Sequence, residues 1–180
     1  MTRALTRSSG NEQGAAPKFP PQEAVLRARL ESADPATHAR WEPTPDLGII
    51  RVVRVYDGDT VTVLCALKGD LYKHNVRLTG VDCPEMRGRG SEEKLAATAV
   101  RDVVRALCLD KVCTITTSGC DKYGRLMGEV CLPDGQDLSS YLLRHSLARA
   151  YEGDTRCAFT PEEIKAIQET SKTLLGQLAA

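Results

Sequence analysis

The chain has 180 residues, of which 42% are hydrophobic. This length and composition suit one ordinary globular domain with an additional tail, and two full domains are not expected. The 24 basic and 24 acidic side chains cancel, which excludes the strong overall positive charge of nonspecific nucleic-acid binders. Any polyanionic ligand must therefore be held by a local group of residues.

Residues 1–45 are rich in Ala, Pro, Ser and Gly and lack hydrophobic periodicity, which predicts a largely disordered tail with room for a short helix around 22–32. The folded domain is expected to span 46–180. From residue 49 onward, β-branched alternating runs predict three consecutive strands joined by tight turns. These strands cover residues 49–56, 60–67 and 72–79.

A helix is expected over 91–107, with Ser91 as its N-cap, followed by strands over 111–117 and 126–132. Asp137 should begin a short second helix that runs through about His145. The capping box of Thr160 and Glu163 predicts a third helix to about Leu175. This order of elements predicts an α+β domain built on a five-stranded OB-type barrel with about three helices.

The cysteine pattern indicates reduced thiols. Seven cysteines is an odd number, and the first thirty residues contain no apolar run typical of a secretory signal, so we expect an intracellular, cytoplasmic protein without a membrane span. The absence of a CxxC pair and the presence of only three histidines argue against structural zinc. A disulfide between Cys113 and Cys131 is an alternative if the two residues face each other across a hairpin.

Three short segments concentrate polar side chains. The first reads DGDT and begins at Asp57; its Asp-Gly pair is interpreted as a hairpin turn. Asp59, however, begins a strand, where a carboxylate is disfavoured, and Thr60 either orients that carboxylate or simply suits the strand. The second segment, RLTGVDCPE at residues 77–85, brings an arginine and two acids to one strand end, where a structural ion pair between its Arg and Asp is an equal alternative.

The third segment reads DKYGR at residues 121–125, and it is also compatible with an ordinary polar hairpin that has Gly124 at a positive φ. In combination, order and spacing, the three segments resemble the staphylococcal nuclease, or thermonuclease, family from about residue 51 to 151. The resemblance implies a Ca²⁺-dependent endonuclease that cleaves DNA or RNA, single strands preferred, to 3′-phosphate and 5′-hydroxyl ends. Mg²⁺ or another divalent cation is an alternative cofactor.

The resemblance also assigns roles to individual residues. Asp59, Asp82 and the backbone carbonyl of Cys83 would bind the metal, because hard cations take oxygen ligands. Glu85 would act as the general base, and the two arginines would clamp the phosphate. The implied catalytic residues are Arg77, Glu85 and Arg125, and the implied substrate-binding residues are Lys122, Tyr123 and Tyr151.

Some positions depart from the family pattern or carry a second interpretation. Cys83 stands where a threonine is common, and would be redox-sensitive if exposed. The segment around Tyr151 is shorter and more acidic than expected, and Lys122 is equally compatible with a solvated surface lysine. Arg87 and Arg89 are predicted either to contact the substrate backbone or to belong to a solubilising loop.

Two other functions compete with catalysis. The first is a noncatalytic nuclease-like module that binds nucleic acid or a protein partner, since folds are reused without their chemistry. The second is an interaction subunit recruited through the tail or the last helix. A pure binding module has no need for the full set of acids and arginines, and no obligate protein partner is indicated by the sequence.

Overall fold

The computed structural model describes residues 21–37, 47–87, 90–153 and 157–179. The chain separates into two compact units, Met1–Trp41 and Glu42–Ala180, which are described one at a time. In the first unit, helix α1 (Pro21–Ser32) is followed by the short 3₁₀ helix η1 (Pro35–Thr37). Helix α1 coincides with the short helix for which the sequence left room; most of the predicted disordered tail falls outside the described residues.

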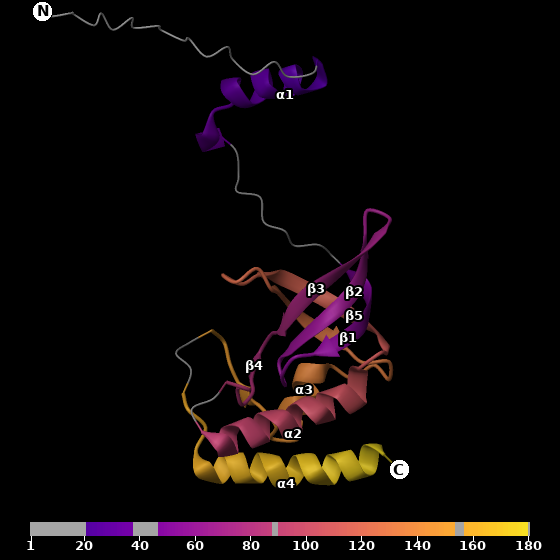
Figure 1. The fold of residues 1–180 in the computed structure, drawn as a ribbon, viewed down its shortest axis with the longest axis vertical. Coiled ribbons are helices and arrows are strands. Elements are labelled where there is room, and N and C mark those ends of the chain that lie inside the picture. The colour runs from indigo at the N-terminus through magenta and orange to yellow at the C-terminus, as the bar shows by residue number, and fades with distance from the viewer. Residues whose placement is uncertain (1–20, 38–46, 88–89, 154–156, 180) are drawn as a thin grey trace, which may run out of the picture. The chain divides into compact units, whose positions relative to one another are not determined.

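The second unit contains a closed five-stranded barrel, as predicted (Figure 1). Its strands follow the spatial order β1-β2-β3-β6-β5. Strands β3 and β6 pair in parallel, and the other neighbours pair in antiparallel fashion. The strands are β1 (Gly48–Val55), β2 (Thr60–Leu67), β3 (Asp70–Leu78), β5 (Val112–Cys120) and β6 (Leu126–Cys131).

The barrel interior is filled by the apolar residues of the alternating pattern. Side chains such as Val52, Val63 and Val76 are fully buried, because every second residue of a strand faces the same side. Helix α2 (Ser91–Cys108) lies across one end of the barrel and buries Val100 and further apolar residues against it (Figure 1). The barrel therefore has a rigid core from which polar side chains can project.

The N-cap of α2 is Gly90, so the prediction of Ser91 was wrong by one residue. No side chain caps this end. Gly90 is tolerated as a cap, and the acids Glu92 and Glu93 in the first turn lie where the helix dipole is positive. The dipole therefore takes over part of the stabilisation that a serine cap would have supplied.

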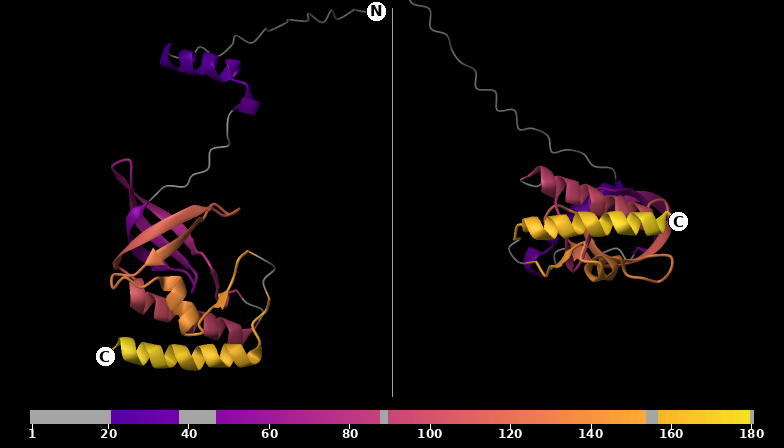
Figure 2. Two further views of the ribbon diagram at one scale, coloured as in Figure 1. Left: turned by 180° about the vertical axis from the view of Figure 1, so that it is seen from behind. Right: turned by 90° about the horizontal axis from the view of Figure 1, so that it is seen from below.

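The two later helices begin as predicted. The Asp137 carboxylate accepts a hydrogen bond from the Ser140 backbone N–H at the start of α3 (Leu138–Arg144). At the start of α4 (Pro161–Leu178), Thr160 and Glu163 exchange the two bonds of a capping box. Helix α4 lies alongside α2 (Figure 2). No helix among the described residues is long and apolar enough to cross a membrane.

All seven cysteines are free thiols, so the alternative Cys113–Cys131 disulfide is not formed. The strand register explains this result. Cys131 lies opposite Thr114 in the β5–β6 pair, whereas Cys113 is the neighbouring residue and is buried. Because successive strand residues point to opposite faces, the two thiols project to different sides of the barrel wall.

A second, two-stranded sheet was not predicted. It pairs β4 (Val81–Asp82) with β7 (Arg149–Ala150), placing Asp82 opposite Arg149. The pairing continues where the Tyr151 N–H donates to the Gly80 carbonyl oxygen over 3.1 Å. This ribbon fixes the backbone from Gly80 to Asp82.

Arg149 also fastens the ribbon to α4. Its guanidinium forms two hydrogen bonds with the Glu163 carboxylate, one of them from Nε to Oε1 over 2.9 Å, and lies 4.3 Å from the centre of the Phe159 ring. The hydrogen bond from Arg149, reinforced by the Thr160 backbone N–H, lowers the pKa of Glu163 to about 2. The pair therefore joins the ribbon that holds Asp82 to the last helix.

This pKa shift predicts a pH-dependent stability. A carboxylate with a lowered folded-state pKa stabilises the fold above its unfolded pKa, and that contribution disappears as the pH falls from about 4.5 to about 2. Since the Glu163 side chain is 40% exposed, solvent screening limits the effect to at most about 1 kcal/mol. Glu163→Gln keeps a side chain suited to the capping box. Urea unfolding should give wild type a higher free energy of unfolding than this variant at pH 7. The difference should nearly vanish near pH 2.

Candidate active site

A cleft of about 1010 Å³ opens on the barrel unit and brings the three polar segments together. Seven of the nine predicted site residues line it, whereas Asp82 and Cys83 are buried beside it. The seven are Asp59, Arg77, Glu85, Lys122, Tyr123, Arg125 and Tyr151. The segments are thus joined in space although they are separated by up to sixty residues in sequence.

Asp59 immediately precedes β2, and its side chain is held in one orientation. Its side chain is 7% exposed. Oδ1 accepts a hydrogen bond from Thr60 Oγ1 over 2.9 Å, and Oδ2 accepts one from the Cys83 backbone N–H over 3.2 Å. Thr60 therefore orients the carboxylate, which is one of the two interpretations that the sequence allowed.

Arg77 lies in the apolar end of β3 and is 3% exposed. Its guanidinium donates to the carbonyl oxygens of Leu78 and Val81 over 3.1 and 2.9 Å. Nη2 also lies 3.1 Å from Asp59 Oδ2 and 3.5 Å from Asp82 Oδ1. The ion pair considered from the sequence is present, and the same guanidinium reaches the cleft.

The acids outnumber the cations at this end of the cleft. Two buried carboxylates, Asp59 and Asp82, both lie within ion-pair distance of the Arg77 guanidinium. Burial, followed by the negative charge of Asp59, raises the pKa of Asp57 to about 7. Excess negative charge and oxygen donors are the properties that a hard divalent cation would complement.

Few side chains at this end of the cleft could serve as metal ligands. No group of three or more His, Cys, Asp or Glu side chains with metal-binding geometry occurs within the described residues. A cation here would take its protein ligands from Asp59, Asp82 and backbone oxygen, and would keep several waters, as Ca²⁺ and Mg²⁺ sites do. Cys83 is 1% exposed, and burial raises the pKa of its thiol well above the usual value. The redox sensitivity considered for an exposed Cys83 therefore does not apply.

Arg125 is positioned by Asp121, a residue to which the sequence assigned no role. Arg125 Nε donates to Asp121 Oδ2 over 2.6 Å, and the Tyr123 and Arg125 backbone N–H groups both donate to Oδ1 over 2.9 Å. Burial opposes ionisation here, but the bonds from Arg125 outweigh it and lower the pKa of Asp121. Gly124 has φ +78°, as a tight turn requires. The polar hairpin considered for residues 121–125 is therefore present, and it also forms part of the candidate active site.

Thr60 links the two halves of the cleft. Besides donating to Asp59, its Oγ1 accepts a hydrogen bond from Arg125 Nη1 over 3.4 Å. This connection joins the carboxylate end to the DKYGR turn. The first and third segments thus meet through one hydroxyl.

Glu85 lies on the exposed stretch between β4 and α2. Its backbone N–H donates to Glu93 Oε1 over 3.4 Å, which ties the stretch to the first turn of α2. The neighbouring side chains of Met86 and Arg87 also line the cleft, whereas Arg89 lies outside the described residues. Glu85 is therefore an accessible carboxylate that lines the cleft.

An exposed aromatic ring marks the other side of the cleft. Tyr123 is 72% exposed, and the cationic groups of Lys122 and Arg125 lie 5.2 and 5.5 Å from its ring centre. Tyr151 is half-buried, and Tyr56, which the sequence analysis did not single out, also lines the cleft. Exposed rings beside positive charge are suited to stacking on bases.

Comparison with known proteins identifies the family. The family model described as staphylococcal nuclease homologue matches residues 75–174, more than half of the chain. The chain belongs to the staphylococcal nuclease family. This membership confirms the resemblance found in the sequence. The matched range includes Arg77, Asp82, Glu85 and Arg125 but not Asp59, whose place beside them is shown by the hydrogen bonds and the ion pair.

Two curated relatives in Escherichia coli, one of them from strain O157:H7, carry the name uncharacterized endonuclease. Each is 35% identical over 105 residues, which cover 57% of this chain. The chain spans 60% of the length of these relatives. The Escherichia coli protein named ParB is 30% identical over 133 residues, covering 69% of both proteins.

Proposed function

We propose that this protein is a metal-dependent endonuclease that hydrolyses phosphodiester bonds in DNA or RNA, with single strands preferred. One observation carries the proposal: a single cleft is lined by an accessible carboxylate, Glu85, by two guanidiniums, Arg77 and Arg125, and by a buried carboxylate, Asp59. A module that only binds nucleic acid needs positive charge. Buried acids beside the phosphate site would weaken such binding unless they serve the chemistry.

The arginines supply the phosphate site in this proposal. A guanidinium forms two parallel, charge-assisted hydrogen bonds to phosphate oxygens, and these strengthen as negative charge develops in the transition state. Arg125 is directed by Asp121 and Thr60, so its donors are oriented before substrate binds. Arg77 is fixed by two backbone carbonyls. This preorganisation lowers the cost of reaching the transition state.

Glu85 is the proposed general base. It removes a proton from a water molecule while the water oxygen forms a bond to phosphorus. The bond from phosphorus to the 5′-oxygen then breaks, and the leaving oxygen takes up a proton from solvent. The products are a 3′-phosphate and a 5′-hydroxyl end.

Asp59, Asp82 and the Cys83 carbonyl are the proposed ligands of a divalent cation, with Ca²⁺ favoured because it accepts irregular oxygen sites that retain water. When bound, such an ion supplies positive charge to a phosphate oxygen and helps to position the attacking water. The proximity of Asp57 supports this assignment, because the negative charge of Asp59 adds to burial in raising the pKa of Asp57 to about 7. Lys122, Tyr123 and Tyr151 are the proposed contacts to the nucleotide.

Cleavage in different metals tests the proposal. Purified protein is incubated with single-stranded DNA, duplex DNA and RNA in Ca²⁺, in Mg²⁺ and in chelator, and the product ends are analysed. We expect Ca²⁺-dependent internal cutting that leaves 3′-phosphates. Binding of the same strands by folded protein without cutting under any metal would instead support a noncatalytic module.

Asp59→Asn removes the charge of the proposed cation ligand and keeps the shape of its side chain. Thermal melting shows whether the variant folds despite its altered contacts with Cys83 and Arg77. The variant should lose most of its activity and also lose the rise in melting temperature that Ca²⁺ gives wild type, since a ligand of the folded state stabilises it. Asp70→Ala is the matched control, as Asp70 is an exposed acid at the start of β3 that does not line the cleft. An unchanged Ca²⁺ response in Asp59→Asn would remove Asp59 from the cation site.

A further inference from the structure

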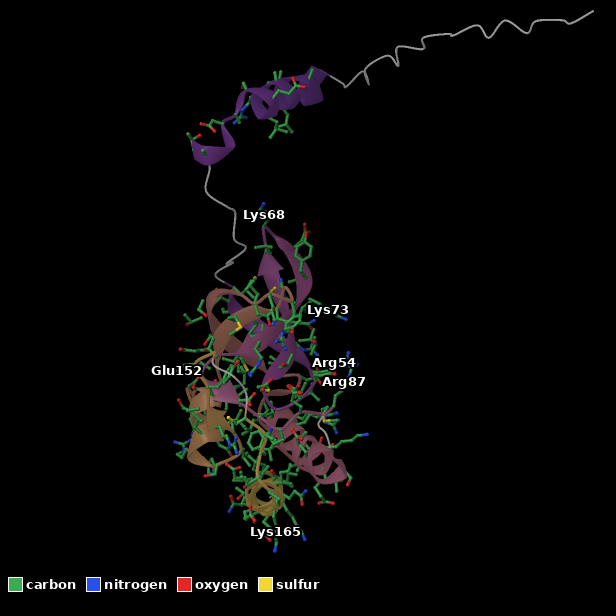
Figure 3. The ribbon with its side chains drawn as sticks, turned by 90° about the vertical axis from the view of Figure 1, so that its left-hand side faces the viewer. Arg54, Lys68, Lys73, Arg87, Glu152 and Lys165 are labelled. Carbon is green, nitrogen blue, oxygen red and sulfur yellow. The ribbon has the colours of Figure 1, made fainter. Side chains whose placement is uncertain are left out.

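A second hollow of about 500 Å³ lies next to the candidate active site and is lined by four arginines. Arg54 comes from β1, Arg87 from the stretch after Glu85, and Arg101 and Arg105 from α2. Figure 3 shows Arg54 and Arg87 projecting from the same side of the molecule. We call this hollow the arginine groove.

The positive charge of the arginine groove is poorly compensated. No acidic side chain is among the described residues that line it. Arg101 forms an ion pair with Asp102 over 3.1 Å, but within the described part of the chain Arg54, Arg87 and Arg105 have no ion-pair partner. Arg101 and Arg105 are also four residues apart on one helix, where like charges repel. The groove is therefore a local positive field in a protein whose formal net charge is zero.

The arginine groove is continuous with the candidate active site. Tyr56, Met86 and Arg87 line both hollows, whereas the DKYGR turn lines only the larger one. The Tyr56 ring is 38% exposed, and the Arg54 guanidinium lies 5.9 Å from its centre. An exposed ring beside arginines is the combination that holds single-stranded nucleic acid, through base stacking and phosphate contacts.

We propose that the arginine groove binds the phosphate backbone of the substrate strand beyond the bond that is cut. The strand runs from the Tyr123 side of the cleft, past Arg77 and Arg125, into the groove, where Arg54 and Arg105 contact successive phosphates. This inference rests on the proposed nuclease function. It adds that affinity rises with strand length, since a substrate too short to reach the groove does not contact these arginines.

Binding of labelled oligonucleotides tests the inference without interference from cleavage. In a Glu85→Gln background, fluorescence anisotropy is measured with single strands of about three and about twelve nucleotides; only the longer strand falls within the site sizes of about 4 to 16 nucleotides of OB folds. The double change Arg54→Gln and Arg105→Gln should weaken binding of the longer strand about tenfold and reduce its salt slope by about 1.4, since each phosphate contact on a single strand contributes about 0.7. Affinity for the shorter strand should change much less.

Arg51→Gln is the matched control. Arg51 lies on the same strand as Arg54, but its guanidinium pairs with Asp110 over 2.9 Å and it lines neither hollow. This variant should bind both strands as the Glu85→Gln parent does, and thermal melting should show that all variants fold. Equal loss of affinity for the short and long strands, or no loss for either, would overturn the proposal.

The same measurements separate this inference from the proposed function. If the protein with Glu85 intact cuts the strands while the groove variants bind like their parent, the nuclease function stands and the groove proposal fails. If it cuts nothing but the groove variants lose affinity only for the longer strand, the groove proposal stands and catalysis fails.

Discussion

Replacing Glu85 with glutamine is expected to lower kcat by about 10²- to 10⁴-fold, the usual contribution of a general base. The amide has nearly the shape of the carboxylate but does not accept a proton from water. Glu85 is exposed, so the melting temperature of the variant should stay within a few degrees of wild type. Stopped-assay kinetics on a labelled single-stranded oligonucleotide measure the effect.

KM and a matched variant show whether the loss is chemical. Because Glu85 carries negative charge next to the phosphate site, its neutralisation should leave KM unchanged or lower it, so the defect appears in kcat. Glu129→Gln on the outer side of β6 is the control, since Glu129 is exposed and does not line the cleft. Wild-type kcat in Glu85→Gln would assign proton removal to another group.

Much of the barrel was predictable from the sequence. Alternation of apolar residues placed each of the five barrel strands to within three residues. In β2, for example, Val61, Val63 and Cys65 are buried at every second position. Local capping chemistry predicted the starts of α3 and α4, where the bonds lie within three residues of one another. Features that depend on residues close together in the chain could thus be predicted from the sequence.

The parts that were missed depend on contacts between distant residues. Strands β4 and β7 have two residues each, too short for a periodic pattern, and they form only because residues 81–82 meet residues 149–150. Asp121 was quoted within its motif, but its role in directing Arg125 is visible only from their hydrogen bonds. The spacing of four positions from Asp121 to Arg125 was the available signal, because one tight turn brings residues at this spacing together.

Gly58 shows a packing requirement that the local sequence does not reveal. The Asp-Gly pair was interpreted as a hairpin turn, and this turn does join β1 to β2. Asp-Gly hairpin turns commonly use a glycine with positive φ. Gly58 is not among the glycines with positive φ. A Cβ at this position would instead lie 2.7 Å from both Cys83 Sγ and Val100 Cγ1. Glycine is required here because α2 and the residue after Asp82 pack directly against the backbone of the DGDT turn.

Gly58→Ala is therefore expected to destabilise the protein by about 1 to 3 kcal/mol, the usual cost of overpacking a core. Relief of the overlap must displace Cys83 or Val100, and Cys83 follows Asp82 directly while its backbone N–H binds Asp59. The variant should therefore lose activity and cation response even at temperatures where it is folded. Urea unfolding followed by circular dichroism measures the loss of stability.

Two further variants test the cause. Gly176→Ala in α4 has open space around its Cβ and no positive φ, so it should stabilise the protein by about 0.5 to 1 kcal/mol, as alanine does within helices. Introducing Gly58→Ala into a Val100→Ala background should cost less than in wild type, because one of the two closest atoms has been removed. Equal costs in the two backgrounds would show that Val100 does not limit the space at residue 58, and would leave Cys83, the residue that joins both proposed metal aspartates, as the source of the overlap.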